Sequence, residues 1–160
     1  MHGTTSHTLV EATRKAEHYC VYQDRCHQEV IAKLHSLRMI PEAIDLIIVH
    51  LIEHDFLNET RFACSFARGK HRIKFWGKIR IVRELKMRGI SEYNIKQGLK
   101  EITDEMYYTN FDALAERHWE HMTERVRLTK RKKFCDFMLR KGFESAMVYE
   151  KVKELEGLEK

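Results

Sequence analysis

The sequence predicts an all-α fold in which three three-helix repeats form one tandem array, elongated and curved. Three observations lead to this prediction. The 160 residues include only 1 proline and 7 glycines, too few turn residues for an all-β sandwich, a collagenous chain or a disordered chain. Apolar residues recur at helical spacing throughout the chain. The pattern of these residues also repeats at offsets of 51 and 53 positions.

The first predicted repeat contains a helix whose apolar face includes Val30, Ile31, Leu34 and Leu37. Pro41 suits the first turn of the next helix, where a missing N–H costs nothing. That next helix has a broad apolar stripe, widened by Leu46 and Val49, and we expect it to be the most buried in its neighbourhood. The stripe consists of Ile44, Ile47, Ile48, Leu51 and Ile52.

The middle repeat is predicted to begin with an N-cap at Asn58, before a helix with Phe62, Ala63 and Phe66. A second helix is expected from about Lys74 to Arg88, with Gly89 ending it. Its predicted stripe is Phe75, Ile79, Val82 and Leu85, with Trp76 at the edge and the cations Lys74, Lys78, Arg80 and Arg83 on its flanks. Ser91 then caps a short helix with Ile95, Leu99 and Ile102.

The last repeat is predicted to hold a long helix from about Asp104 to Met122, a basic helix and a final helix. The basic helix includes Phe134, Phe137 and Met138 and ends at Gly142. The final helix includes Val148, Val152 and Leu155.

Corresponding positions support the division into repeats. At an offset of 51, Leu34 aligns with Leu85 and Ile44 with Ile95, and at 53, Gly89 aligns with Gly142. We place the repeats at residues 5–54, 55–102 and 103–160. A three-helix unit is too small to bury its own apolar face, so the units are expected to stack and form an extended concave surface. Such a surface suits a large partner better than a small-molecule substrate.

Charge is concentrated in two stretches of the chain, although the formal net charge is only +5. Residues 68–88 carry nine Lys or Arg and one acid, and residues 124–141 carry eight Lys or Arg and two acids. Either these are two solvated helix faces, or together they form a surface that meets a polyanion.

Compartment signals are consistent with one another. No apolar run reaches the roughly 20 residues of a membrane span, and no signal peptide is visible, so we expect a cytoplasmic protein without a membrane partner. Cys20, Cys26, Cys64 and Cys135 form no CxxC pair, and we expect free, at least partly buried thiols.

Three segments resemble the RecX family of recombination regulators. Leu57-Asn58-Glu59-Thr60-Arg61-Phe62-Ala63 is similar to its LDDxRFA signature, and the segment from Trp76-Gly77 to Gly89-Ile90 is similar to the stretch that follows it. Lys133-Phe134 and Leu139-Arg140-Lys141-Gly142-Phe143 resemble its C-terminal motif. Asn58 and Cys26 depart from the pattern at helix caps. Arg38 stands where the later repeats have glycine, so the first repeat is expected to need a different helix stop.

The resemblance implies three tandem three-helix repeats, no catalytic residues, no metal and no cofactor. It implies binding to the RecA nucleoprotein filament, usually inhibiting RecA, and it leaves direct contact with single- or double-stranded DNA open. Basic residues of the middle and last repeats would line the binding face. In this chain they are Arg68, Lys70, Arg72, Lys74, Lys78, Arg80, Arg83, Lys130, Arg131, Lys132 and Lys133.

Other functions compete with this interpretation. His50, Glu53 and His54 match the H-x-x-E-H pattern of inverted zinc peptidases, but no third ligand stands out, and His118 with His121 forms only a common i, i+3 pair.

A stand-alone nucleic-acid-binding protein is the main alternative, because cations alternate with aromatic residues at Lys74-Phe75-Trp76 and Lys132-Lys133-Phe134. In the structural interpretation Phe75 and Phe134 belong to the core, while Trp76 could pack or contact a ligand. A helical adaptor for another acidic protein is the third possibility.

Overall fold

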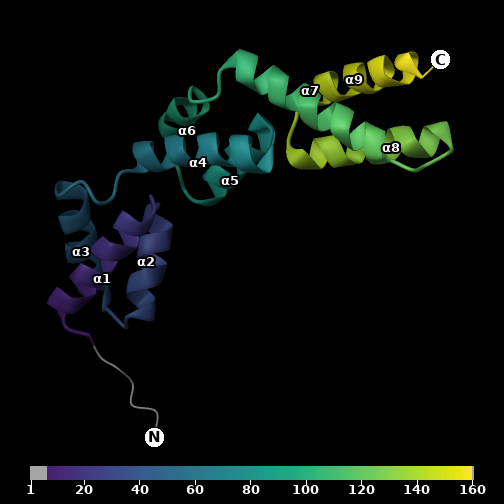
Figure 1. Ribbon diagram of the computed structural model, residues 1–160. Coiled ribbons are helices and arrows are strands. Elements are labelled where there is room, and N and C mark those ends of the chain that lie inside the picture. Colours follow the sequence, from purple (N-terminus) through teal and green to yellow (C-terminus); the bar gives the residue numbers. More distant parts are fainter. Residues whose placement is uncertain (1–6, 160) are drawn as a thin grey trace, which may run out of the picture.

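The fold is a bent, elongated array of helices, and Figure 1 shows α1 and α9 at its opposite ends. The structure is a computed structural model, and it describes residues 7–159. Nine helices and no strands occur within this range. They are α1 (Leu9–Tyr22), α2 (His27–Ser36), α3 (Pro41–Glu53), α4 (Glu59–Lys74), α5 (Lys78–Met87), α6 (Glu92–Leu99), α7 (Asp104–His121), α8 (Arg127–Lys141) and α9 (Ser145–Leu158). The all-α prediction is confirmed.

Local sequence explains where most helices begin. The side chains of Thr8, Asn58, Ser91 and Thr103 each accept a hydrogen bond from a backbone N–H in the first turn of the helix they precede. Pro41 occupies the first turn of α3. The predicted caps at Asn58 and Ser91 and the predicted place of Pro41 are therefore confirmed.

The same helix stop ends α2, α5 and α8. A left-handed residue follows the helix in each case: Arg38 with φ 62°, Gly89 with φ 74° and Gly142 with φ 102°. The next N–H then donates back five residues, from Met39 to Leu34, from Ile90 to Leu85 and from Phe143 to Met138. The expectation of a different stop in the first repeat is wrong, because an arginine adopts the conformation that glycine adopts in the other two repeats.

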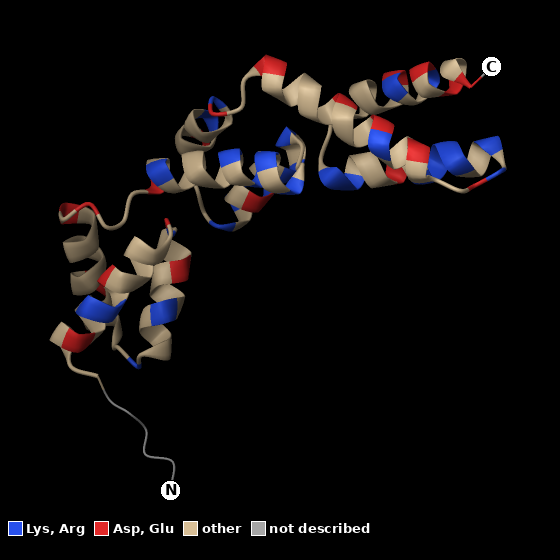
Figure 2. Cartoon of the chain, viewed as in Figure 1, with Lys and Arg blue, Asp and Glu red and all other residues tan. Residues whose placement is uncertain are grey.

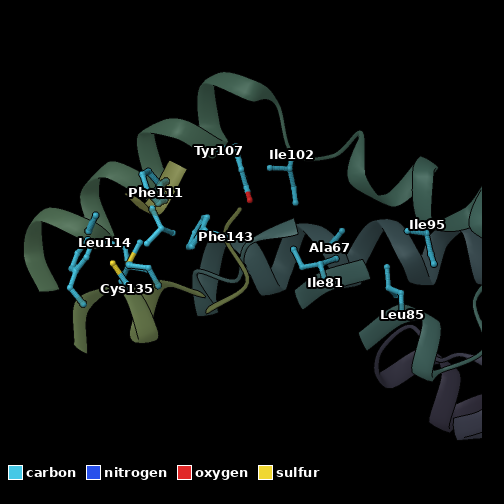
Figure 3. Packing of buried hydrophobic residues seen from close by; sticks show 14 of the residues in the cluster. Ala67, Ile81, Leu85, Ile95, Ile102, Tyr107, Phe111, Leu114, Cys135 and Phe143 are labelled. Carbon is cyan, nitrogen blue, oxygen red and sulfur yellow. The ribbon is translucent and has the colours of Figure 1, made fainter. Parts of the chain in front are cut away.

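The buried residues form two cores. One lies within α1, α2 and α3 and includes Leu34, Ile47 and Leu51. The other is continuous from α4 to α9, and Figure 3 shows its members Ile81, Phe143 and their neighbours between the helices. The second and third helix groups therefore share one core, as stacked repeats should. The first group has a separate core of its own, so the expectation that no unit buries its own apolar face is wrong for this group.

Two predicted apolar faces need correction. The predicted helix from about Lys74 to Arg88 starts too early, because α4 ends at Lys74, Phe75 is left-handed with φ 58°, and α5 begins only at Lys78. The buried positions of α5 are consequently Ile81 and Leu85, while Ile79 is exposed. In α3, only Ile44, Ile47 and Leu51 are buried. Ile48 is only partly buried, and Leu46, Val49 and Ile52 are exposed, so the buried face of α3 is narrower than the predicted stripe. α3 still buries as many residues as α1 and more than α2.

The first sequence motif joins two groups of helices. Leu57, Phe62 and Ala63 are buried. Arg61 Nε donates to Asp24 Oδ1 at 2.9 Å, and the Ser65 hydroxyl donates to Asp24 Oδ2 at 2.7 Å. The motif therefore fastens α4 to the loop that follows α1.

Candidate functional site

Basic residues of the first charged stretch are largely free of carboxylate partners. Arg68 pairs with Glu101 at 3.1 Å, and Lys78 lies 3.8 Å from the exposed Asp104. The other predicted residues here form no ion pair within residues 7–159, and they are Lys70, Arg72, Lys74, Arg80 and Arg83. Figure 2 shows these cations along α4 and α5. This surface therefore keeps most of the positive charge that the sequence assigns to it.

Basic residues of α8 are in a different state, because each predicted cation has an acidic partner. The partners are Glu159 for Lys130, Glu156 for Arg131, Asp136 for Lys132 and Glu124 for Lys133. Arg127, in the same helix, also contacts Glu156 at 3.1 Å.

Glu156 is the strongest of these partners. Its side chain is only 4% exposed. Hydrogen bonds from Arg131 and Arg127 hold the pKa of its carboxyl at about 2. The cations from Arg127 to Lys133 are therefore held in ion pairs within α8 and with α9 and the α7–α8 loop, which reduces the field that they project.

Trp76 lies beside cations rather than in a helix. Its half-buried ring packs edge-on against Phe66, with ring centroids 6.1 Å apart. The Arg80 guanidinium lies 4.1 Å from the ring centroid and the Lys70 ammonium lies 5.0 Å from it. Phe134 is fully buried, as predicted, whereas Phe75 is half-buried against the core. Trp76 thus combines packing with a charged environment.

Four cations converge where α4 and α5 meet α7 and α8, and we call them the junction cluster. The cluster consists of Lys74, Arg80, Arg117 and Lys141. Lys141 Nζ donates to the Lys74 carbonyl at 2.9 Å, and an Arg80 N–H donates to the Arg140 carbonyl at 3.3 Å. No carboxylate within the described residues pairs with any of the four.

Electrostatics in the junction cluster is unfavourable for the protein alone. Burial, together with the charges of Arg80, Lys74 and Arg117, lowers the pKa of the Lys141 ammonium. Arg80 Nε is enclosed and has no hydrogen-bond partner. Unpaired cations held this close favour an anion that can lie between them.

Sequence reasoning missed Arg117 and Lys141 as site residues. They meet Lys74 and Arg80 only because the second and third helix groups dock. The Gly77 N–H donates to the Lys141 carbonyl at 2.8 Å, and the Ile79 N–H donates to the Gly142 carbonyl at 3.0 Å. A Cβ on Gly77 would lie 2.3 Å from the Gly142 carbonyl carbon, so glycine is required for this approach. In the sequence, the only sign of this docking was glycine in the Trp76-Gly77 and Lys141-Gly142 pairs, because glycine permits two backbones to approach closely.

The histidine pairs lie in ordinary surroundings. His54 Nδ1–H donates to the His50 carbonyl at 2.9 Å, and His50 lies 3.5 Å from Glu17. His118 stacks on Phe137 with ring centroids 3.7 Å apart, and burial lowers the pKa of its imidazole. No group of three or more His, Cys, Asp or Glu in the described part of the chain is arranged to hold a metal ion.

Two further findings concern membranes and thiols. Among the described helices, none combines the length and apolar character that crossing a membrane requires. The four cysteines are unbonded, with Cys64 half-buried and the others buried, as predicted.

Comparison with known proteins gives a consistent result. Residues 58–99 match the family model described as RecX, second three-helix domain. The chain is 27% identical over 153 residues to the regulatory protein RecX of Enterococcus faecalis, covering 89% of this chain and 58% of that protein. It is 26% identical over 145 residues to the regulatory protein RecX of Bacillus cytotoxicus, covering 91% and 54%. The chain thus spans little more than half the length of these curated relatives.

A solved structure agrees with the observed architecture. The crystal structure of RecX from Lactobacillus salivarius is 28% identical and superposes with a TM-score of 0.73. The match covers 92% of this chain and 96% of that one. The three-helix organisation is therefore shared over almost the whole length of both.

Proposed function

The chain belongs to the RecX family, and from this premise we propose that it is a regulatory protein that binds the RecA–DNA filament. The expected consequences are reduced RecA ATPase, strand exchange and co-protease activity. The proposed role is regulatory rather than catalytic, and it places the protein in the cytoplasm, where such filaments form. We also propose that the repeats divide at 54/55 and 102/103.

The observation that carries this proposal is the junction cluster with the free cations beside it. A RecA filament presents DNA phosphates along a helical path, and a bent array can follow such a path (Figure 1). Unpaired cations at the centre of that array attract phosphates without first breaking internal ion pairs. Binding of this kind weakens steeply as salt rises, because counterions are released from the nucleic acid.

Residues predicted on α8 contribute to the proposed face in a different way. Lys130, Arg131, Lys132 and Lys133 must exchange an internal carboxylate for a phosphate, so each gains less on binding than an unpaired cation. We propose that Arg68, Lys70, Arg72, Lys74, Lys78, Arg80 and Arg83 supply most of the affinity, together with the rest of the junction cluster.

The deciding experiment measures the DNA-dependent ATPase of RecA with and without this chain. We expect inhibition at ratios well below one chain per RecA, because one bound regulator blocks extension of a whole filament. A nucleic-acid-binding protein that acts alone would give another result, with tight, salt-sensitive binding to naked DNA and an unchanged ATPase of DNA-bound RecA. That result would establish the alternative.

Two double variants test which cations matter. Lys74→Glu with Arg117→Glu reverses two exposed members of the junction cluster, and Lys132→Glu with Lys133→Glu reverses two exposed, paired cations of α8. The change in formal charge is the same in both. We expect filament affinity to fall about 100-fold in the first and no more than about tenfold in the second, with helicity unchanged. Equal losses would show that the ion pairs do not govern the contribution of α8.

A further inference from the structure

The outer face of α3 is apolar and exposed, and we call Leu46, Val49 and Ile52 the outer α3 face. Their exposed fractions are 62%, 51% and 47%. Spacings of three residues place them in one stripe along the helix. The opposite side of α3 packs on α1 and α2 through Ile47 and Leu51. The stripe is therefore additional to the apolar surface that holds α3 in the fold.

Corresponding helices show that the repeat itself does not need this stripe. At the offsets of 51 and 53 positions, the outer α3 face aligns with positions on α6 and α9 and their ends. These positions hold Gln97, Lys100 and Thr103 in the second repeat, and Glu150, Lys153 and Glu156 in the third. All six are polar. An apolar stripe at these positions is thus peculiar to the first repeat, and solvation alone would favour polar residues there.

The formal charges on α3 itself have a single sign. Glu42, Asp45 and Glu53 lie on the exposed side of α3, and none forms an ion pair with a described residue. Among the described helices α3 alone contains no Lys or Arg, and Figure 2 shows it without a blue segment. In a chain of net charge +5, this helix is therefore a local acidic and apolar surface.

A hollow continues the stripe at its C-terminal end. Ile52 lines a hollow of about 430 Å³ together with His27, Asp55 and Glu59. Asp55 is 76% exposed and pairs with Arg61, and Glu59 pairs with His27. The hollow therefore adds polar, ion-paired side chains at the point where the apolar stripe ends, and the unpaired acidic charge lies on α3 itself.

We propose that the outer α3 face docks an amphipathic helix of another protein, with an apolar stripe flanked by Lys or Arg. A helix fits because the stripe runs along a convex cylinder, onto which helical ridges pack. Basic flanks fit because they would meet Glu42, Asp45 and Glu53. In a two-fold dimer through this face the same acids would oppose one another, and anionic lipid or nucleic acid would be repelled.

This proposal is independent of filament binding, because the outer α3 face lies on the surface of the α1–α3 group and the junction cluster lies between α4–α6 and α7–α9. The stripe is smaller than the roughly 800 Å² per partner of a standard interface, so the interaction should be weak and transient, in the micromolar range. The whole chain, without RecA or DNA, is therefore a suitable binding partner for a helical test peptide.

The probe is a synthetic amphipathic peptide of about 18 residues with leucines on one face and lysines on the other, about five helical turns. Its matched control has glutamate in place of each lysine. Binding to the full chain is measured by fluorescence anisotropy, and the site is located by amide chemical shifts in NMR spectra. We expect micromolar affinity for the lysine peptide, with shifts confined to α3 and the neighbouring hollow, and at least about tenfold weaker binding of the glutamate peptide.

The decisive variant combines Leu46→Gln, Val49→Lys and Ile52→Thr, which are the residues of the second repeat at these positions. We expect at least about tenfold weaker binding of the lysine peptide, with unchanged helicity and unchanged RecA ATPase inhibition. Met87→Gln removes a comparably exposed apolar side chain from α5 and should change nothing. Equal binding of both peptides, or full binding by the triple variant, would overturn the proposal. Self-association that only the triple variant abolishes would overturn it in favour of a second copy as occupant.

Discussion

Arg38 is the residue at which a single substitution should make the protein more stable. It adopts φ 62° where the other repeats use glycine, and an L-residue in this region costs about 1–2 kcal/mol. Its side chain is exposed and forms no ion pair with a described residue, so replacing it with glycine removes little stabilising contact. Glycine also loses about 0.5–1 kcal/mol more backbone entropy on folding. The net expectation for Arg38→Gly is therefore a gain of about 0.5–1 kcal/mol.

Reciprocal substitutions in the other repeats should act in the opposite direction. Gly89→Ala brings a Cβ to 3.1 Å from the flexible Gln28 amide, which can move aside, so the cost of positive φ dominates. We expect the free energy of unfolding to fall by about 1 kcal/mol. Gly142→Ala places a Cβ 2.3 Å from the Cβ of Arg80 and 2.6 Å from its backbone nitrogen. That contact forces the helix groups apart and should cost about 3 kcal/mol or more.

Urea unfolding followed by circular dichroism measures all three variants. The expected order of stability is Arg38→Gly, wild type, Gly89→Ala and Gly142→Ala. For a chain of this size, the gain in Arg38→Gly corresponds to a rise in Tm of about 1–4 °C. A loss of stability in Arg38→Gly, with losses in the glycine variants as expected, would mean that contacts of the arginine outweigh its backbone strain.

Three further predictions concern the joints between helices. Because Arg131 and Arg127 lower the pKa of Glu156 from 4.5 to about 2, their stabilising effect is present above pH 4.5 and is lost as pH falls toward 2. Glu156→Gln should therefore lose up to about 3 kcal/mol at pH 7 and much less at pH 2, and a pH-independent difference in urea unfolding would contradict this. The buried Tyr107 hydroxyl accepts from the Lys78 N–H and donates to Glu144, so Tyr107→Phe should lower the free energy of unfolding by about 1–3 kcal/mol, and an unchanged thermal midpoint would refute it. Gly77→Ala should cost about 2 kcal/mol or more and increase hydrogen exchange at the Ile79 amide, whereas unchanged exchange would show that the joint relaxes freely.

Features governed by local chemistry were predictable from the sequence. Asn58 and Ser91 cap helices because their side chains reach the N–H groups of the following turn, and no distant residue alters this. Gly142 ends α8 because glycine adopts positive φ without strain. Apolar spacing identified the helices, and the offsets of 51 and 53 positions revealed the repeat.

The break between α4 and α5 was not predictable in the same way. Phe75 adopts a left-handed conformation that its own chemistry disfavours, and tertiary contacts hold it there. Lys141 donates to the Lys74 carbonyl beside it, and the Gly77 N–H donates to the Lys141 carbonyl. Both contacts join residues more than 60 positions apart in the sequence. Local spacing therefore started the second helix at about Lys74 instead of Lys78, and the buried face of α5 was assigned to the wrong residues.

Charge counting could not distinguish the two basic stretches, because the distinction depends on distant partners. Glu156 and Glu159 lie 25 to 29 positions from the α8 cations that they neutralise. The junction cluster arises in the opposite way, since docking brings Arg117 and Lys141 to Arg80 without bringing a carboxylate. The junction between α4–α5 and α7–α8 thus keeps unpaired positive charge, whereas carboxylates of α9 and its C-terminal end neutralise cations of α8. If the protein binds a polyanion, affinity should follow this distribution of unpaired charge rather than the number of Lys and Arg in each stretch.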